Sequence, residues 1–160
     1  MSSAAGDNLE LIRGGYAAWN RGDIDGVVTI LDEQVEWHGH PRLPEPGPYF
    51  GRDAVKGWLD DLRGVWEEIE IHPLAVAESG DNVVVLVQIS GRGRGSGVEV
   101  QSGIDAHVWT LGGGRATRMR WLQGDKVAEG LDLAPDEVRS VGEEALAERL
   151  PLLLAGAEGE

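Results

Sequence analysis

The sequence predicts an α+β fold: a cone-shaped barrel in which a curved, mostly antiparallel sheet wraps around three N-terminal helices. Two observations support this class. Apolar residues recur at helical spacing through most of the first 65 residues and alternate at strand spacing between residues 68 and 122. The glycines at 112–114 separate two long alternating segments and indicate a hairpin. Helices gathered early and strands gathered late favour helices packed on a sheet.

Amphipathic helices are predicted at 8–20, 24–31 and 52–65, with Asp7 and Asp23 as the N-caps of the first two. The apolar stripe of the first helix consists of Leu9, Ile12, Tyr16 and Trp19. Strands are predicted at 34–40, 68–77, 83–90, 98–111 and after Gly114. A short helical turn is expected at 125–131 and a longer helix at 135–154.

Two segments are predicted to be loops. The stretch from 41 to 51 holds four of the seven prolines and is expected to form a rim or lid beside a pocket. The glycine-rich run at 91–97 lacks the Gly-Lys-Ser/Thr ending of a phosphate-binding loop, so we interpret it as a hairpin connection. The chain therefore divides into an α+β domain at 1–131 and a C-terminal helical extension with a flexible tail at 132–160.

Composition excludes several classes of function. The net charge is −14, from 28 acidic and 14 basic residues, which argues against nucleic-acid binding. No apolar run approaches the roughly 20 residues of a membrane span, and the N-terminus lacks the pattern of a secretory signal. Without cysteine, there is neither a disulfide nor a thiol nucleophile. We expect a cytoplasmic protein that does not bind membranes.

The hairpin at 102–122 carries the best candidate site. Alternation places Asp105, His107 and Trp109 on one face of its first strand, and Thr117, Met119 and Trp121 on one face of its second. A carboxyl, an imidazole and two indoles on the concave side of a sheet are typical of an apolar small-molecule pocket. Asp105 either acts on a ligand or is paired structurally with Arg120 or His107.

The strand at 34–40 carries a second group of candidates. Glu36, His38 and His40 share one of its faces, opposite Val35 and Trp37. An imidazole titrates near neutral pH, so His38 is a candidate general base. Three such donors could also bind a metal, but we favour a solvated strand end because no further ligand motif is present.

The tryptophans are numerous, six against one phenylalanine. The candidates for lining the cavity, where they could stack on a flat aromatic ligand, are Trp19, Trp58, Trp109 and Trp121. For Trp19 and Trp66 we favour ordinary core packing.

Several motifs resemble the nuclear transport factor 2-like superfamily, in its SnoaL-like polyketide cyclase and ketosteroid isomerase branch, over residues 8–131. They are Ala-Ala-Trp-Asn-Arg-Gly-Asp-Ile-Asp-Gly-Val-Val (17–28), Val-Glu-Trp-His (35–38), Tyr-Phe-Gly-Arg-Asp-Ala-Val (49–55), Ile104-Asp105 and Met119-Arg120-Trp121. The resemblance implies this fold and a homodimer formed through the sheet. It does not settle the activity, because the family includes isomerases, cyclases, epoxide hydrolases and non-enzymes.

The resemblance also implies site residues. His38 stands where the isomerases have their catalytic aspartate, and Asp105 matches their second acid. Their tyrosine donor falls near Gly15, so Tyr16 is one residue out of register, and a rotation of about 100° is expected to turn its phenol away from the cavity. The isomerase set is thus incomplete, and an Asp–His pair is more similar to the cyclases.

We therefore predict a cofactor-independent acid–base enzyme, isomerase-like or cyclase-like, that acts on a hydrophobic, carbonyl-bearing small molecule. His38 and Asp105 are the predicted catalytic residues, and no metal is expected. The predicted substrate-binding residues are Tyr16, Glu36, His40, Trp58, His107, Trp109, Met119 and Trp121. The alternatives are an epoxide hydrolase, a dehydratase, and a non-catalytic, dimeric ligand-binding protein. In the epoxide hydrolase, Asp105 and Arg120 would activate water, although alternation argues against these two residues sharing a face.

Overall fold

The structure is a computed structural model that describes residues 4–39, 47–93, 95–131 and 148–149. Its elements, in chain order, are α1 (Ala4–Asn20), α2 (Ile24–Thr29), β1 (Leu31–Trp37), β2 (Tyr49–Phe50), α3 (Arg52–Val65), β3 (Trp66–Ser79), β4 (Asn82–Gly93), β5 (Glu99–Gly112), β6 (Arg115–Leu122) and α4 (Gly124–Leu131). His40 and, apart from residues 148 and 149, the helix predicted at 135–154 lie outside the described residues.

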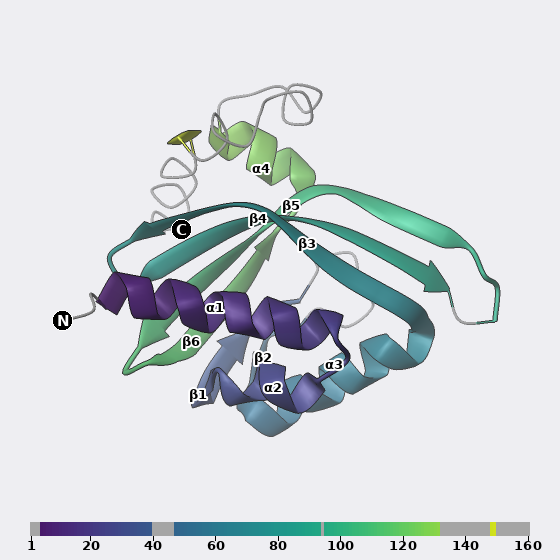
Figure 1. Cartoon of the computed structure of the whole chain (residues 1–160), viewed down its shortest axis with the longest axis horizontal. Coiled ribbons are helices and arrows are strands. Elements are labelled where there is room, and N and C mark those ends of the chain that lie inside the picture. The colour runs from purple at the N-terminus through teal and green to yellow at the C-terminus, as the bar shows by residue number, and fades with distance from the viewer. Residues whose placement is uncertain (1–3, 40–46, 94, 132–147, 150–160) are drawn as a thin grey trace.

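The strands form one six-stranded sheet in the order β2-β1-β6-β5-β4-β3. All neighbours are antiparallel except β1 and β6, which run parallel. Figure 1 shows the long strands β3, β4 and β5 curving over α1, with α2 and α3 on the same side of the sheet and α4 on the other. The predicted α+β class is confirmed, and the sheet is open rather than closed into a complete barrel.

Apolar residues on both faces of the central strands hold the layers together. On the concave face, Val83, Val85 and Val87 join the large core that packs against α1, α2 and α3. On the convex face, Val84 and Leu86 join a second cluster that includes Val127, Ala128 and Leu131 of α4. The run of valines in β4 is therefore buried on both sides, as its continuous apolar sequence predicts.

The ends of several elements differ from the predictions. Asp23 is the N-cap of α2, as predicted, and its carboxylate accepts a hydrogen bond from the Gly26 N–H at 2.9 Å. α1 begins earlier than predicted, at Ala4, so Asp7 lies in its first turn and is not its N-cap. A carboxylate in the first turn still interacts favourably with the helix dipole.

The segment predicted to be a loop at 41–51 contains β2, whose Tyr49 and Phe50 pair with Trp37 and Glu36. Such a two-residue strand is specified by its partner across the sheet and has no periodicity of its own.

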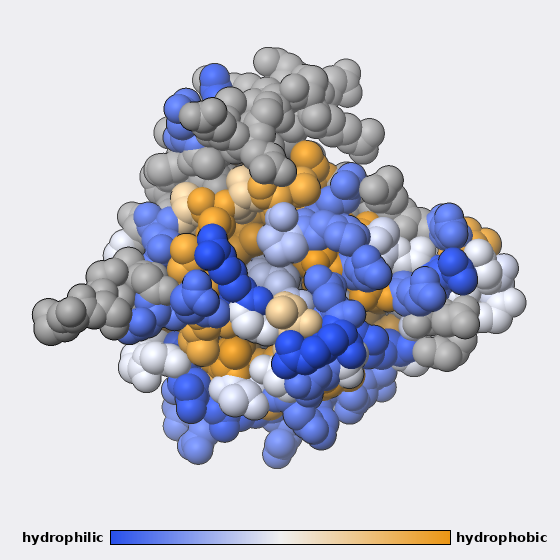
Figure 2. All heavy atoms as spheres, in the orientation of Figure 1, coloured by the Kyte–Doolittle hydropathy of each residue, from blue (hydrophilic) through white to orange (hydrophobic). Residues whose placement is uncertain are grey.

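No helix in the described part of the chain is long and apolar enough to span a bilayer. Hydrophilic residues cover much of the lower edge of the face shown in Figure 2, where α2 and α3 lie.

Candidate functional site

A cavity of about 270 Å³ lies between the concave face of the sheet and the helices α1, α2 and α3. Most of its wall is apolar. The lining residues are Gly15, Tyr16, Trp19, Val27, Ile30, Trp37, Trp58, Leu59, Leu62, Trp66, Ile69, Ile71, Ile89, Gly91, Asp105, His107, Trp109 and Trp121. The wall therefore combines aliphatic and aromatic surface with a single carboxyl, a single imidazole and a phenol.

All six tryptophans of the chain line this cavity. Trp58, Trp109 and Trp121 lie where the sequence analysis expects them. Trp19 and Trp66, for which we favoured ordinary core packing, also reach the wall. Trp37 packs against two of the other indoles: its ring centroid lies 5.8 Å from that of Trp109 and 6.0 Å from that of Trp58. The cavity wall is therefore rich in aromatic rings, on which a flat ligand can pack.

Two of these indoles carry unused hydrogen-bond donors. Within the described part of the chain, the Nε1 atoms of Trp19 and Trp37 are buried and have no hydrogen-bond partner. A buried N–H without an acceptor costs free energy.

Asp105 and His107 occupy the wall formed by β5, and their side chains are only 5% and 3% exposed. The Asp105 carboxylate accepts a hydrogen bond from Trp121 Nε1–H at 3.0 Å. The His107 ring lies edge-on to Trp121, with the centroids 4.3 Å apart. As alternation predicts, Asp105, His107 and Trp109 share the face that lines the cavity.

Tyr16 joins α1 to this polar region. Its Oη lies 2.6 Å from Nδ1 of His107 and accepts a hydrogen bond from Trp109 Nε1–H at 3.0 Å. The expectation that a register shift turns the phenol away from the cavity is wrong. Tyr16 lies on the stripe of α1 that faces the sheet, and Gly15 beside it allows close packing, since a Cβ there would lie 2.6 Å from Ile30 Cδ1.

Burial raises the pKa of the Tyr16 phenol well above its ordinary value, and the hydrogen bond from Trp109 offsets only part of that shift. The retained proton stabilises the fold below the unfolded pKa of about 10, and this stabilisation is lost as the pH rises above that value. We expect the difference between the alkaline absorbance titrations of the wild type and Tyr16→Phe to show no tyrosinate from Tyr16 until the protein unfolds. A Tyr16 ionisation near pH 10 in the folded protein would contradict this.

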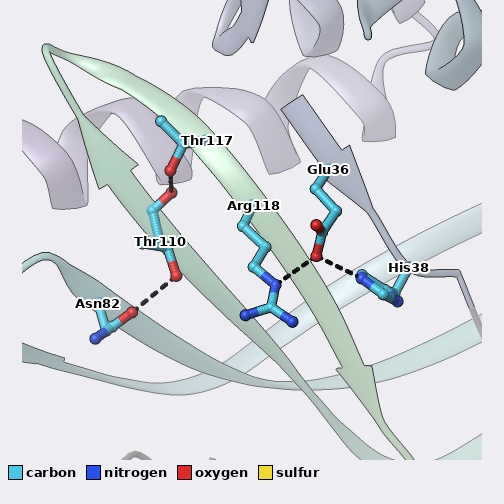
Figure 3. A network of polar contacts seen from close by, with 6 residues as sticks. All are labelled: Glu36, His38, Asn82, Thr110, Thr117 and Arg118. Atoms are coloured by element: carbon cyan, nitrogen blue, oxygen red, sulfur yellow. Dashed lines mark hydrogen bonds and ion pairs between the residues drawn. The ribbon is translucent and has the colours of Figure 1, made fainter. Parts of the chain in front are cut away.

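Glu36 and His38 do not line the cavity. Glu36 Oε2 lies 2.8 Å from His38 Nε2 and 2.7 Å from Arg118 Nε, in the network that Figure 3 shows across β1 and β6. The hydrogen bond with His38 and the charge of Arg118 hold the pKa of Glu36 below its ordinary range. Val35 and Trp37 are the residues of β1 that face the core.

The structure thus reverses the expected orientation of β1, and it does not bring His38 into one hollow with Asp105. The physical reason is that burial of Val35 and Trp37 stabilises the fold, whereas burial of Glu36 and His38 would require desolvation of a charge. Among the described residues, no group of three or more His, Asp or Glu side chains is placed to hold a metal ion.

One residue of β6 differs from its expected role. Met119, a predicted ligand contact, is fully buried in the core and is not part of the cavity wall. Arg120 pairs with Val108 of the convex cluster, so alternation places it on the face opposite Trp121 and away from the cavity. Asp105 and Arg120 therefore lie on opposite faces of the sheet, as alternation predicts, whereas the epoxide hydrolase alternative requires them on one face.

β3 and β4 contribute an end of the cavity that is not among the sequence predictions. Ile69 and Ile71 alternate with glutamate and histidine in β3, and they face Ile89 and Gly91 of the neighbouring strand. The alternation in Glu68-Ile69-Glu70-Ile71-His72 is a sequence signal for this wall. Periodicity alone does not say which residues of a long hairpin reach the site.

An open sheet whose concave face and helices enclose an apolar cavity, with a carboxyl and an imidazole in its wall, defines a small-molecule-binding α+β domain. The family model described as SnoaL-like domain matches residues 12–119, and the chain belongs to this family. No curated protein matches the chain.

Several solved structures are similar to this chain. TerC, co-crystallised with polyporic acid, is 27% identical with a TM-score of 0.66, and the match covers 73% of this chain and 91% of TerC. Bal32a, from a soil-derived mobile gene cassette, is 26% identical with a TM-score of 0.67, covering 74% and 90%. A protein of ketosteroid isomerase-like fold from Catenulispora acidiphila, in complex with trimethylamine, is 17% identical with a TM-score of 0.64, covering 79% and 95%. At that identity, the last comparison shows the fold alone.

Proposed function

We propose that this protein is an acid–base enzyme that isomerises or cyclises a compact, hydrophobic, carbonyl-bearing small molecule. The observation that carries the proposal is the burial of Asp105 and His107 in the wall of the apolar cavity. A buried acid and base in an apolar site can exchange protons with a ligand while bulk water is excluded. This replaces the predicted His38 with His107, because His38 lies outside the cavity wall.

The shape and chemistry of the cavity support the choice of ligand. Its volume of about 270 Å³ lies near the lower end of the roughly 300–1,000 Å³ of typical ligand sites, so the ligand is compact. The indoles favour a flat aromatic system. No lysine or arginine is among the residues that line the cavity, so a highly charged anion has no partner there. The polyporic acid bound to TerC supports a small organic ligand on this scaffold.

Proton transfer between the ligand and the β5 pair would proceed through an enolate. One group removes a proton from the carbon beside the carbonyl, while the other donates a hydrogen bond to the oxygen on which negative charge develops. The same groups return the proton at another carbon. In a cyclisation, the enolate carbon instead attacks a second carbonyl and closes a ring, and the alkoxide formed there takes up the proton that was removed. The low dielectric constant of the cavity strengthens the interaction of the base with the proton and that of the donor with the negatively charged oxygen.

The proposal is tested with a panel of aromatic ketones of increasing ring number. Because all six tryptophans line the cavity, we expect binding to quench the intrinsic fluorescence along a saturable curve. Ile89→Phe places a ring in the cavity wall and is expected to lower the binding affinity for the larger ligands by about tenfold or more. Gln88→Phe adds the same ring one residue away, on the other face of β4, and serves as the matched control.

Turnover is measured on the same panel by mass spectrometry. Rearranged or cyclised product that disappears with Asp105→Asn supports the proposal. Binding without turnover of any ketone, epoxide or alcohol would instead indicate a non-catalytic binding protein. A large loss of turnover in His38→Ala, with Asp105→Asn still active, would place the chemistry outside the cavity.

The homodimer implied by the resemblance remains a proposal, which sedimentation velocity tests.

A further inference from the structure

We infer that Tyr16 and Trp109 fix His107 in the tautomer whose single proton is on Nε2, so that His107 is the hydrogen-bond donor of the site and Asp105 is its proton acceptor. The tautomer follows from the hydrogen bonds and from the burial of Tyr16. The two roles rest on the proposed function, because they assume that a ligand reacts in this cavity.

The direction of the hydrogen bonds is set by Trp109. An indole Nε1–H can only donate, so the 3.0 Å contact between Trp109 and Tyr16 uses one lone pair of the phenol oxygen as acceptor. Tyr16 must then place its own proton elsewhere. Among the described residues, Nδ1 of His107, at 2.6 Å, is the one acceptor within hydrogen-bond distance of Tyr16 Oη.

The opposite arrangement is disfavoured by burial. If Nδ1 of His107 carried the proton, the Tyr16 oxygen would accept from both His107 and Trp109, and its own O–H would have no acceptor in the described structure. Tyr16 is buried, and an unsatisfied buried hydroxyl is costly. Transfer of the phenol proton to His107 would create a buried phenolate, which the raised pKa of Tyr16 opposes. The proton therefore stays on Tyr16 and points at Nδ1.

A fixed tautomer of His107 gives the two polar residues of β5 different roles, one as hydrogen-bond donor and the other as proton acceptor. With Nδ1 occupied as an acceptor, the remaining ring nitrogen of a neutral His107 carries N–H and can only donate. A neutral imidazole of this kind can stabilise negative charge on a carbonyl oxygen. Asp105, which already accepts from Trp121, is then the group that can take a proton from the ligand. A matching ligand needs an acceptor oxygen and an adjacent acidic C–H.

The tautomer is tested by NMR of protein labelled with ¹⁵N-histidine near neutral pH, with His107→Gln used to assign the signals among the four histidines. We expect the wild type to show an unprotonated Nδ1 and a protonated Nε2 for His107. Tyr16→Phe removes the donor and Trp109→Phe removes its orienting partner, so both should shift the pattern toward mixed tautomers. Tyr49→Phe deletes the other phenol hydroxyl of the chain, outside the cavity wall, and should leave the pattern unchanged.

A wild-type His107 protonated on Nδ1 would overturn the inference, as would a pattern unchanged by both Tyr16→Phe and Trp109→Phe. Thermal unfolding of each variant shows whether it is folded, so two independent variants keep the test valid if one fails to fold. If the wild type has the expected tautomer but no ligand is converted, the inference on the tautomer stands and the proposed function fails.

The roles are tested on a converted substrate. We expect Tyr16→Phe to lower kcat about tenfold with little change in KM, the effect of roughly one hydrogen bond on a transition state. His107→Gln should retain more activity than His107→Asn, because only the longer amide can present an N–H near the position of Nε2. Asn equal to or better than Gln would overturn the assignment of His107 as the Nε2 donor.

Discussion

Asp105→Asn is expected to lower turnover about 10²–10⁴-fold, the contribution typical of general acid–base catalysis, while ligand affinity changes little. The substitution keeps the shape of the side chain, and the amide oxygen can still accept the hydrogen bond from Trp121 Nε1–H. What is lost is the ability to take up a proton. Single-turnover kinetics and fluorescence binding on the same substrate separate the two effects.

Asp81→Asn is the matched control for this variant, since it makes the same change at an exposed aspartate in the turn between β3 and β4. It should retain wild-type turnover. Equal rates for wild type and Asp105→Asn would mean that Asp105 plays a structural part only, as acceptor for Trp121.

Met119→Ala is expected to lower the free energy of unfolding by about 2–5 kcal/mol, the cost of truncating a large apolar side chain in a packed core. Met119 is 0% exposed and belongs to the core cluster of the concave face. Urea unfolding followed by tryptophan fluorescence measures the change, with an unaltered slope indicating the same unfolding transition.

Val98→Ala provides the comparison for Met119→Ala, because Val98 is 58% exposed and its truncation should change stability by no more than about 0.5 kcal/mol. Should Met119→Ala leave stability unchanged and weaken only ligand binding, the methionine would belong to the cavity wall, as the sequence analysis proposed.

Local patterns predicted most of the fold. The helix at 52–65 is found with the predicted bounds, because its apolar stripe at helical spacing follows directly on a glycine and is not interrupted. Alternation in β5 correctly placed Asp105 and His107 on one face, since a strand has a strict period of two. These features depend on neighbours in sequence and not on the packing of distant segments.

The errors concern orientation, which local patterns leave undetermined. In β1 the apolar pair Val35 and Trp37 already indicated the buried face, but the expectation followed the family's catalytic position at His38 instead. For Tyr16, the register along one helix does not determine how that helix crosses the sheet. The contact of Tyr16 with His107 joins residues 91 positions apart, and no spacing rule reaches that far.

The double-sided burial of β4 limits how this protein can be altered. Val83, Val85 and Val87 support the layer around the cavity, while Val84 and Leu86 support the layer beneath α4. A shift of this strand's backbone would disturb the packing of both layers at once. Substitutions in the middle of the sheet are therefore poorly suited to enlarging the cavity for a larger ligand. The end of the β3–β4 hairpin away from its turn is less tightly packed on both faces. Ile71 and Ile89 face the cavity there, whereas their neighbours His72 and Gln88 are polar. Changes of specificity in related chains are expected to accumulate at that end.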